Sequence, residues 1–425
     1  MGLLRAGTLV CALVVLAASA SAAQAGWSKP FEFAKPGTLD YLPSQLAFSP
    51  GGAAAAAFGV EDADAPASSQ AYLTSRTAGG AVGNPLKIGG AQQILALSYD
   101  GRAVELLTGA SPSGQACCSS AQAVQVSAQG RLGRARTLVG GLTGDTQGRL
   151  LTLADGQMMA AVATQRGVWV VQSSRSNRFG AQHLLTGKGA QPESLAAAWL
   201  GGEQTVVAWT EGAARTIYVA TGSRAKAPGH PRAALSLPAG HSIDELAVAR
   251  RGSGATLTWT ESWFDRGGAY HSQVQAADLA GHPRIRTLSS PARLASGLSF
   301  GADAAGDQGA AWESCTANAS CAVQTARRGP KARFGGVSNL GSIDPSQSPS
   351  LAVGQRGQVM VAWVRGGRPV AAVGSASRGR FGSATSLSTS TYAADITAAF
   401  GRGSQALAAW TQGTLNTSVV GAAYR

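Results

Sequence analysis

Short apolar runs separated by turn signals set the pattern of this chain. The runs are five to eight residues long, and none carries apolar residues at the helical spacing with flanking caps, so we expect no long helix. Glycine, with 56 residues, punctuates the runs together with turn pairs such as Asp100-Gly101 and Asp155-Gly156. The pattern predicts an all-β protein.

The apolar runs belong to a repeat. Segments of roughly fifty residues recur from Leu42 to the C-terminus, and most contain a run ending in Ala-Trp or Thr-Trp. We interpret the repeated tryptophan as a core residue packed between neighbouring repeats, because aromatic side chains mostly serve cores. Phe58 and Leu107 take the matching place in two repeats that lack it. The clearest tryptophans are Trp209, Trp259, Trp312, Trp363 and Trp410.

One well-preserved repeat shows the unit. We expect a first, inner strand at 350–354, a second at 358–364, a third at 369–376 and an outer strand at 381–385, joined by Gly-rich turns. A repeated unit of four antiparallel strands is the signature of a β-propeller blade. The sequence therefore predicts a single propeller.

The count of repeats predicts eight blades, with seven as the alternative because the 142–189 copy has lost its tryptophan. The last repeat stops after its third strand, near Val419 to Ala423. We expect the segment from Trp27 to Phe33 to supply the missing outer strand, which closes the ring and removes open sheet edges. The repeats fall near 42–90, 91–141, 142–189, 190–240, 241–290, 291–342, 343–389 and 390–425.

The N-terminal residues match a secretory signal. Arg5 precedes an apolar core from Leu9 to Leu16, which is too short to span a bilayer, and Ala23-Gln24-Ala25 fits the cleavage rule. We therefore expect a signal peptide at 1–25 and a propeller domain at 26–425. No later stretch is apolar for long enough to enter a membrane, so we predict a secreted or cell-envelope protein. We also expect the protein to be a monomer.

The charge is high but dispersed. Removal of Arg5 with the signal takes the formal charge from +13 to +12, and no basic run is longer than Arg327-Arg328. Scattered charge favours a soluble surface with at most weak attraction to polyanions. No basic helix or aromatic-basic interleave appears, so we expect no nucleic-acid partner.

Four cysteines remain after cleavage, an even number that favours disulfides in an exported chain. Cys315 and Cys321 bracket a short loop and should close a hairpin. Cys117 and Cys118 are adjacent, and we expect either a vicinal disulfide that stiffens a loop tip or, less favoured, a bond from one of them to Cys315.

Candidate binding residues lie in the loops between second and third strands, the variable part of the repeat. Glu61, Cys117 and Cys118 mark the loops of the first two repeats. Adjacent strand residues point to opposite sides, so Trp263 and Phe264 cannot both be core, and an exposed one would form a stacking platform. The predicted ligand-binding residues are Trp263, Phe264, Asp265, Arg266, Arg365, Glu211 and Glu261.

Catalytic and metal-binding patterns fail. The nucleophile-elbow string around Ser299 lies in a predicted inner strand instead of a strand–turn–helix. The acidic loop at Glu61, Asp62 and Asp64 lacks the glycine and distal Glu of a calcium loop. The five histidines are dispersed, without zinc-site spacing. We therefore expect no catalytic residue, no metal and no cofactor.

In repeat form the Ala-Trp blades resemble secreted bacterial propellers grouped loosely with sialidase-like proteins. That resemblance implies an arginine cluster, a Tyr-Glu pair and Asp-box turns, but Ser98-Tyr99-Asp100-Gly101 is shorter than an Asp box and lacks its tryptophan. No catalytic residue carries over. We predict an exported, non-enzymatic binding or scaffolding module for an envelope glycan or protein, with a glycoside hydrolase as the alternative.

Overall fold

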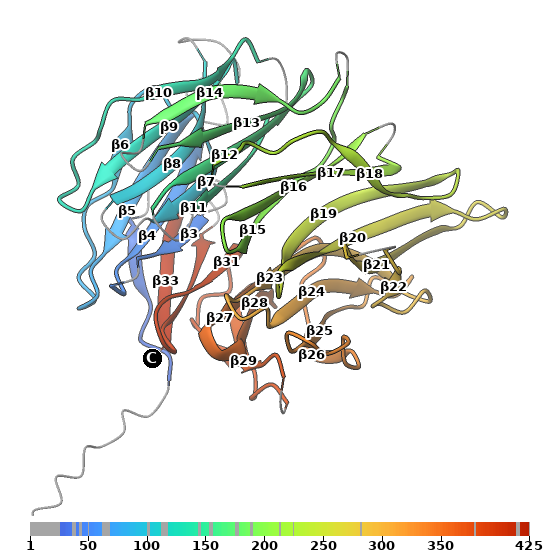
Figure 1. Ribbon diagram of the computed structural model, residues 1–425. Helices are drawn as coiled ribbons and strands as arrows, with labels where there is room; N and C mark the ends of the chain where they lie inside the picture. Colours follow the sequence, from blue (N-terminus) through green and yellow to red (C-terminus); the bar gives the residue numbers. More distant parts are fainter. Residues whose placement is uncertain are drawn as a thin grey trace, which may run out of the picture.

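The computed structural model is an all-β propeller of eight antiparallel blades arranged around a central axis (Figure 1). The predicted fold is confirmed, and the 142–189 repeat forms a complete blade despite its missing tryptophan. The structure describes residues 26–35, 40–41, 45–49, 51–61, 69–99, 103–111, 118–142, 146–152, 156–174, 178–187, 190–211, 214–223, 225–280, 283–377, 380–413 and 417–424.

Blades one to four follow the predicted repeats. The inner strand of blade one is split into two pieces that both pair with β4. The strands are β2 (Asp40–Tyr41), β3 (Gln45–Phe48), β4 (Ala54–Glu61), β5 (Gln70–Arg76) and β6 (Leu86–Ile88); β7 (Gln93–Tyr99), β8 (Ala103–Ala110), β9 (Ser120–Ser127) and β10 (Arg136–Gly140); β11 (Gln147–Thr152), β12 (Met158–Thr164), β13 (Gly167–Ser173) and β14 (Phe179–Leu184); β15 (Leu195–Gly201), β16 (Gln204–Glu211), β17 (Thr216–Ser223) and β18 (Arg232–Ser236).

Blades five to eight complete the ring, with a 3₁₀ turn at Gln355–Gly357 between the first two strands of blade seven. The strands are β19 (His241–Arg251), β20 (Gly254–Phe264), β21 (Tyr270–Asp278) and β22 (Arg286–Thr287); β23 (Leu294–Ala302), β24 (Gln308–Cys315), β25 (Cys321–Arg328) and β26 (Ser338–Ser342); β27 (Ser350–Gly354), β28 (Gln358–Arg365), β29 (Arg368–Ser375) and β30 (Thr385–Ser386); β31 (Ala393–Phe400), β32 (Ala406–Gln412), β33 (Ser418–Tyr424) and β1 (Phe31–Ala34).

The second strand is the most buried element of blades one to seven, and in blade eight it is as buried as the third, which explains the unbroken apolar runs in the sequence. In β28 every residue from Val359 to Val364 is buried. The five repeated tryptophans are fully buried, and each packs against the preceding blade: Trp363, for example, clusters with Ala311 and Val323 of blade six. Their predicted structural role is confirmed. Phe58 is also buried against the preceding blade, whereas Leu107 is buried against blade three, the following one.

The inner strands form a closed ring, because β3 contacts both β7 of the next blade and β31 of the last. The N-terminal strand completes blade eight as predicted. Phe31 lies opposite Gly421 and Ala34 opposite Val419 in an antiparallel pair with β33, and Trp27 bridges to Tyr424. Each end of the chain is therefore held by the other.

The outer strand of blade seven departs from the prediction. In blade seven the segment expected to pair from Phe381 is paired only at β30, which is two residues long. Before it, the backbone N–H of Gly382 donates to Val373 O at 2.9 Å, and Gly83, Gly133, Gly229 and Gly335 make the same bond in other blades. Blade seven thus has the shorter ladder, whereas the outer strands β10, β18 and β26 keep five residues beside the same glycine bond.

The remaining sequence predictions divide between confirmed and untested. The Cys315–Cys321 disulfide is present and closes the β24–β25 hairpin. The signal peptide, Cys117, Asp62 and Asp64 lie outside the described residues, as does the side chain of Glu61, so these predictions stay open. No helix in the described part of the chain is long and apolar enough to cross a bilayer.

Candidate functional site

One face of the ring, which we call the loop face, is formed by the C-terminal ends of the second strands and the loops that follow them. Equivalent strands end at the same rim, so the predicted residues Glu211, Glu261 and Arg365 all lie on this face, in blades four, five and seven. They do not form one cluster, because each belongs to a different blade. The opposite face carries the turns between first and second strands and between third and outer strands.

The second and third strands of blade five form a projection on the loop face. Its strands β20 and β21 hold 11 and 9 residues, and their hairpin extends beyond the neighbouring blades (Figure 1). The tip is a built turn, because Asp265 Oδ1 accepts backbone N–H bonds from Gly267 at 2.8 Å and Ala269 at 3.0 Å. Gly268 has φ +81°, a conformation that favours glycine. The projection is thus ordered by its own hydrogen bonds.

Trp263 is stacked between two histidines on one side of the hairpin. His241 and His271 lie directly across from it in the strand register. The ring centroids are 5.0 Å apart to His241 and 5.3 Å apart to His271, and the planes are within 18° of parallel. Trp263 is half-buried, so one edge of this three-ring row remains open to solvent.

Glu261 holds the base of the row. Its carboxylate lies 2.6 Å from His241 Nδ1 and accepts a bond from Gln275 Nε2 at 2.9 Å. Glu261 is buried, so its role is to orient His241 and with it the tryptophan face. A direct contact between Glu261 and a ligand stays a prediction. In the structure Glu261 contacts His241 and fixes its ring.

The other side of the hairpin presents an aromatic pair. Phe264 is 69% exposed and Tyr270 is 44% exposed, and their ring centroids are 5.3 Å apart. Of the two adjacent aromatics, Phe264 is therefore the exposed one. Arg266 is exposed at the tip beside Asp265. His271 Nε2–H donates to Asp265 Oδ2 at 3.0 Å, and this hydrogen bond, with backbone bonds, holds the pKa of Asp265 below its usual value.

The other predicted residues have separate surroundings. Glu211 Oε1 accepts the indole N–H of Trp209 at 2.6 Å, which is a structural use of the carboxylate. Arg365 is exposed and lines a pocket of about 270 Å³ with Arg368 and Thr391 in blade seven. Neither residue reaches the blade-five hairpin in the described interactions.

Sequence reasoning missed His241, His271 and Tyr270. The histidines were expected to be dispersed, yet the strand pairing places two of them on either side of Trp263. The position of His271 could have been predicted. Residues 263 and 271 are equidistant in sequence from the turn at Gly267, so a hairpin places them opposite each other. His241 could not be found this way, because a bulge between Ile243 and Glu245 shifts the register of β19.

A second polar cluster joins blades five and six. Glu245 Oε2 accepts bonds from Thr260 at 2.8 Å and from the backbone N–H of Leu298 at 2.8 Å. Glu313 accepts a bond from Ser296 at 2.9 Å. Burial raises the pKa of Glu313, and the negative charge of Glu245 adds to the effect. Ser299 stays in strand β23, as predicted, where its hydroxyl accepts the backbone N–H of Leu351.

The raised pKa of Glu313 predicts a pH effect on stability. The folded protein holds this proton at higher pH than the unfolded chain, so the contribution is present below the unfolded value of 4.5 and is lost as the pH rises through the folded pKa. We expect Glu313→Gln to shrink the drop in unfolding free energy between pH 4 and pH 7, measured by urea denaturation. Glu193→Gln, at an exposed carboxyl, is the control, and an equal change in both variants would contradict the prediction.

Comparisons with known proteins place the fold but no family. No protein-family model matches the chain, and no curated protein matches its sequence. A solved polysaccharide lyase has a similar structure, with a TM-score of 0.51 and 10% identity over 81% of this chain and 91% of the lyase. A solved ulvan lyase, also a polysaccharide lyase, has a TM-score of 0.50 and 8% identity over 93% of this chain and 95% of that one. At such identity the similarity establishes the propeller fold alone.

Proposed function

We propose that the protein is an exported glycan-binding module that holds sugar rings on the blade-five hairpin. The observation that carries the proposal is the pair of exposed aromatics, Phe264 and Tyr270, at the end of an ordered projection. Exposed apolar surface of this kind is a recognised mark of binding sites. Phe264 is the most exposed large hydrophobic residue in the described part of the chain.

The chemistry of the hairpin suits a sugar. Pyranose rings have apolar C–H faces and polar hydroxyl edges, and aromatic rings with polar neighbours match both. Phe264 and Tyr270 offer the apolar surface, while Asp265, Arg266 and His271 surround the tip with donors and acceptors. The similarity to solved polysaccharide lyases agrees with a glycan ligand. The signal-like N-terminus and the Cys315–Cys321 disulfide support export.

Two binding assays test the proposal. The first measures binding to polysaccharides in native affinity gels, and the second measures binding to cell-envelope fractions. We expect Phe264→Ala to weaken binding about tenfold, equivalent to about 1.4 kcal/mol, and Trp263→Ala to weaken it as well. The loss should persist in high salt, because stacking is not screened. Tyr392→Ala is the matched control, since Tyr392 is 61% exposed but lies in blade eight.

Two results would reject the glycan proposal. One is equal loss of binding in Phe264→Ala and Tyr392→Ala, and the other is binding by envelope protein alone with no polysaccharide retained.

A glycoside hydrolase is the second candidate, favoured by the raised pKa of Glu313 beside the carboxylate of Glu245. Release of reducing ends that Glu313→Gln abolishes would establish it in place of a binding module.

A further inference from the structure

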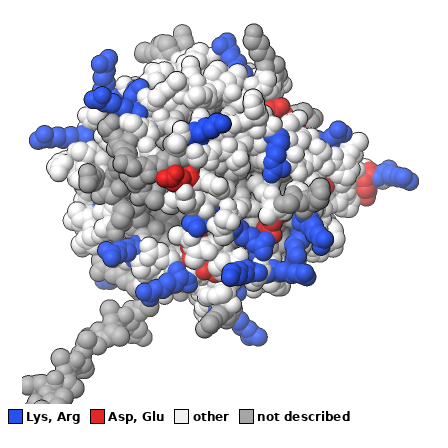
Figure 2. Space-filling view, viewed as in Figure 1, with Lys and Arg blue, Asp and Glu red and all other residues white. Residues whose placement is uncertain are grey.

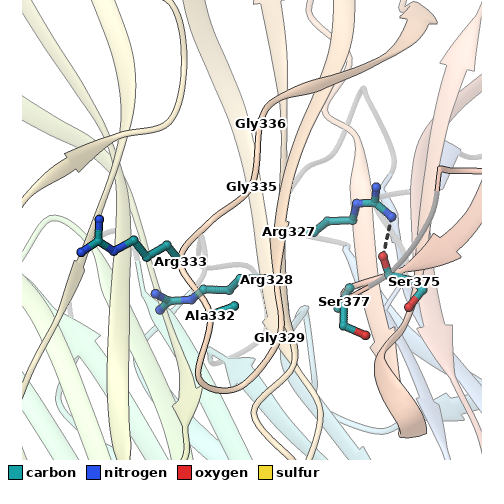
Figure 3. A pocket seen from close by; sticks show the side chains of 10 residues that line it. Arg327, Arg328, Gly329, Ala332, Arg333, Gly335, Gly336, Ser375 and Ser377 are labelled. Atoms are coloured by element: carbon teal, nitrogen blue, oxygen red, sulfur yellow. Dashed lines mark hydrogen bonds between the residues drawn. The ribbon is translucent and has the colours of Figure 1, made fainter.

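A second pocket lies on the opposite face, between blades six and seven. It has a volume of about 300 Å³, at the lower end of the range of roughly 300–1,000 Å³ for small-ligand sites. Its walls are the ends of β25 and β29 and the loop from Gly329 to Gly336 (Figure 3). No residue of the blade-five hairpin contributes to it.

Two adjacent arginines at the end of β25 point to opposite sides, toward different blades (Figure 3). Arg328 turns to blade five, where it pairs with Asp278 at 2.6 Å, and it lies over the ring of Phe334 of its own blade at 4.3 Å. Arg327 turns to blade seven, where it donates to the carbonyl of Ser375 and lies over Phe381 at 4.3 Å. Each guanidinium is therefore held in place.

Positive charge exceeds negative charge around this pocket. Asp278 is shared between Arg328 and Arg251, so one carboxylate serves two guanidiniums. Burial, with repulsion from Arg286, lowers the pKa of Arg328 to about 10. Arg333 is exposed on the pocket wall and makes no ion pair with the described residues. Figure 2 shows basic side chains gathered over β21, β22, β25 and β26.

The carboxylates near the pocket do not cancel this excess. Asp307 lies on the Gly329 side, where a side chain at residue 329 would come within 3.7 Å of its Oδ1. Burial, and after it the neighbouring Asp303, raise the pKa of Asp307. Asp303 accepts backbone N–H bonds from Ala305, Asp307 and Gly357. The three carboxylates of Asp278, Asp303 and Asp307 are outnumbered by the four guanidiniums of Arg251, Arg327, Arg328 and Arg333.

The pocket is open and already ordered. The loop is fixed by bonds from Gly335 N–H to Arg327 O at 2.9 Å and from Arg251 to Ala332 O at 3.4 Å. Glycine and alanine line much of it, which leaves room for a ligand. The exposed hydroxyl of Ser377, on the blade-seven side, adds a donor.

We propose that this pocket binds a tetrahedral oxyanion of the sulfate or phosphate class, either as a free ion or as a substituent on a larger molecule. Arg327 and Arg333 would supply charge-assisted donors from two sides, and Ser377 a neutral donor. The proposal does not depend on the glycan site of blade five, because the two sites lie on opposite faces and share no residue.

Gly336→Glu tests the proposal by placing a carboxylate in the pocket. A Cβ at Gly336 meets nothing within 4 Å, so the variant should fold. We expect it to bind dextran sulfate about tenfold more weakly than the unchanged protein, because a new negative charge opposes the anion at close range. Gly229→Glu, which also has an open Cβ position and lies in the matching loop of blade four, should bind as the unchanged protein does.

Three further arms identify the ligand. Neutral dextran should not bind at this pocket. Arg333→Gln should weaken dextran sulfate binding in part, whereas Arg178→Gln, at an exposed arginine of blade three, should not weaken it. If inorganic sulfate raises the melting temperature as much as dextran sulfate does, at equal anion concentration, the free ion is sufficient; if only dextran sulfate raises it, the anion must be carried on a larger molecule. Equal loss in Gly336→Glu and Gly229→Glu would reduce the effect to net charge and overturn the site.

Discussion

Replacing Phe33 by alanine is expected to lower the free energy of unfolding by about 3–5 kcal/mol, which is the usual cost of truncating a buried phenylalanine. Phe33 is 1% exposed, and its ring lies against Gly421 of β33, so closely that a Cβ there would come within 2.7 Å of it. The same ring belongs to the core cluster between blades eight and one, with Phe58 and Leu407. Losing it weakens the strand that closes the ring.

Urea denaturation measures this effect, with Glu32→Ala as the matched control in the same strand. Glu32 is exposed, so its truncation should leave stability nearly unchanged. Removal of β1 as a whole should be more severe, because it opens the edge of β33 and promotes association between chains. A Phe33→Ala variant as stable as Glu32→Ala would contradict the view that the N-terminal strand holds the propeller closed.

Replacing Asp278 by asparagine is expected to cost about 3 kcal/mol, at the lower end of the range for breaking a buried ion pair. The lower end applies because Asp278 is 29% exposed, whereas its partner Arg328 is only 2% exposed. The variant leaves Arg328 with its hydrogen bond to Gln308 Oε1 at 2.6 Å but without a countercharge. It also removes one of the links between blades five and six, while the bond from Leu298 N–H to Glu245 remains.

Thermal unfolding of Asp278→Asn beside Asp265→Asn separates the two kinds of ion pair. Asp265 pairs with His271 at the exposed hairpin tip, where water screens the charges, so its loss should have little effect on stability. If both variants melted together with the unchanged protein, the Asp278 bridge would be irrelevant to stability.

Most of the fold could be predicted from the sequence repeat. A fully buried second strand requires an unbroken apolar run. The packing of one blade on the next requires a large side chain at the same position of each repeat. The five repeated tryptophans therefore indicated both where each blade lies in the sequence and which side chains form its core. The truncated last repeat and the spare segment near Phe31 predicted the closure, because an unpaired sheet edge must be covered. The outer strand of blade seven was predicted to begin at residue 381, whereas the paired strand begins at Thr385.

The site was predicted in part. Alternation along a strand required one of Trp263 and Phe264 to be exposed, and Phe264 is that residue. Sequence alone could not show that His241 and His271 enclose Trp263, because that depends on the register of three strands and on a bulge. Nor could it show that Arg327 and Arg328 serve different blades, which their adjacency in the sequence conceals.

The sequence by itself thus determined the all-β propeller, its eight blades, its tryptophan core, its closure and the Cys315–Cys321 disulfide. These follow from local periodicity and repetition, which the chain carries in every segment. Only the tertiary structure decided which side chains meet across blades, such as Arg328 with Asp278. Such contacts arise where repeats are packed side by side, and their geometry depends on strand register and blade orientation, which no single repeat encodes.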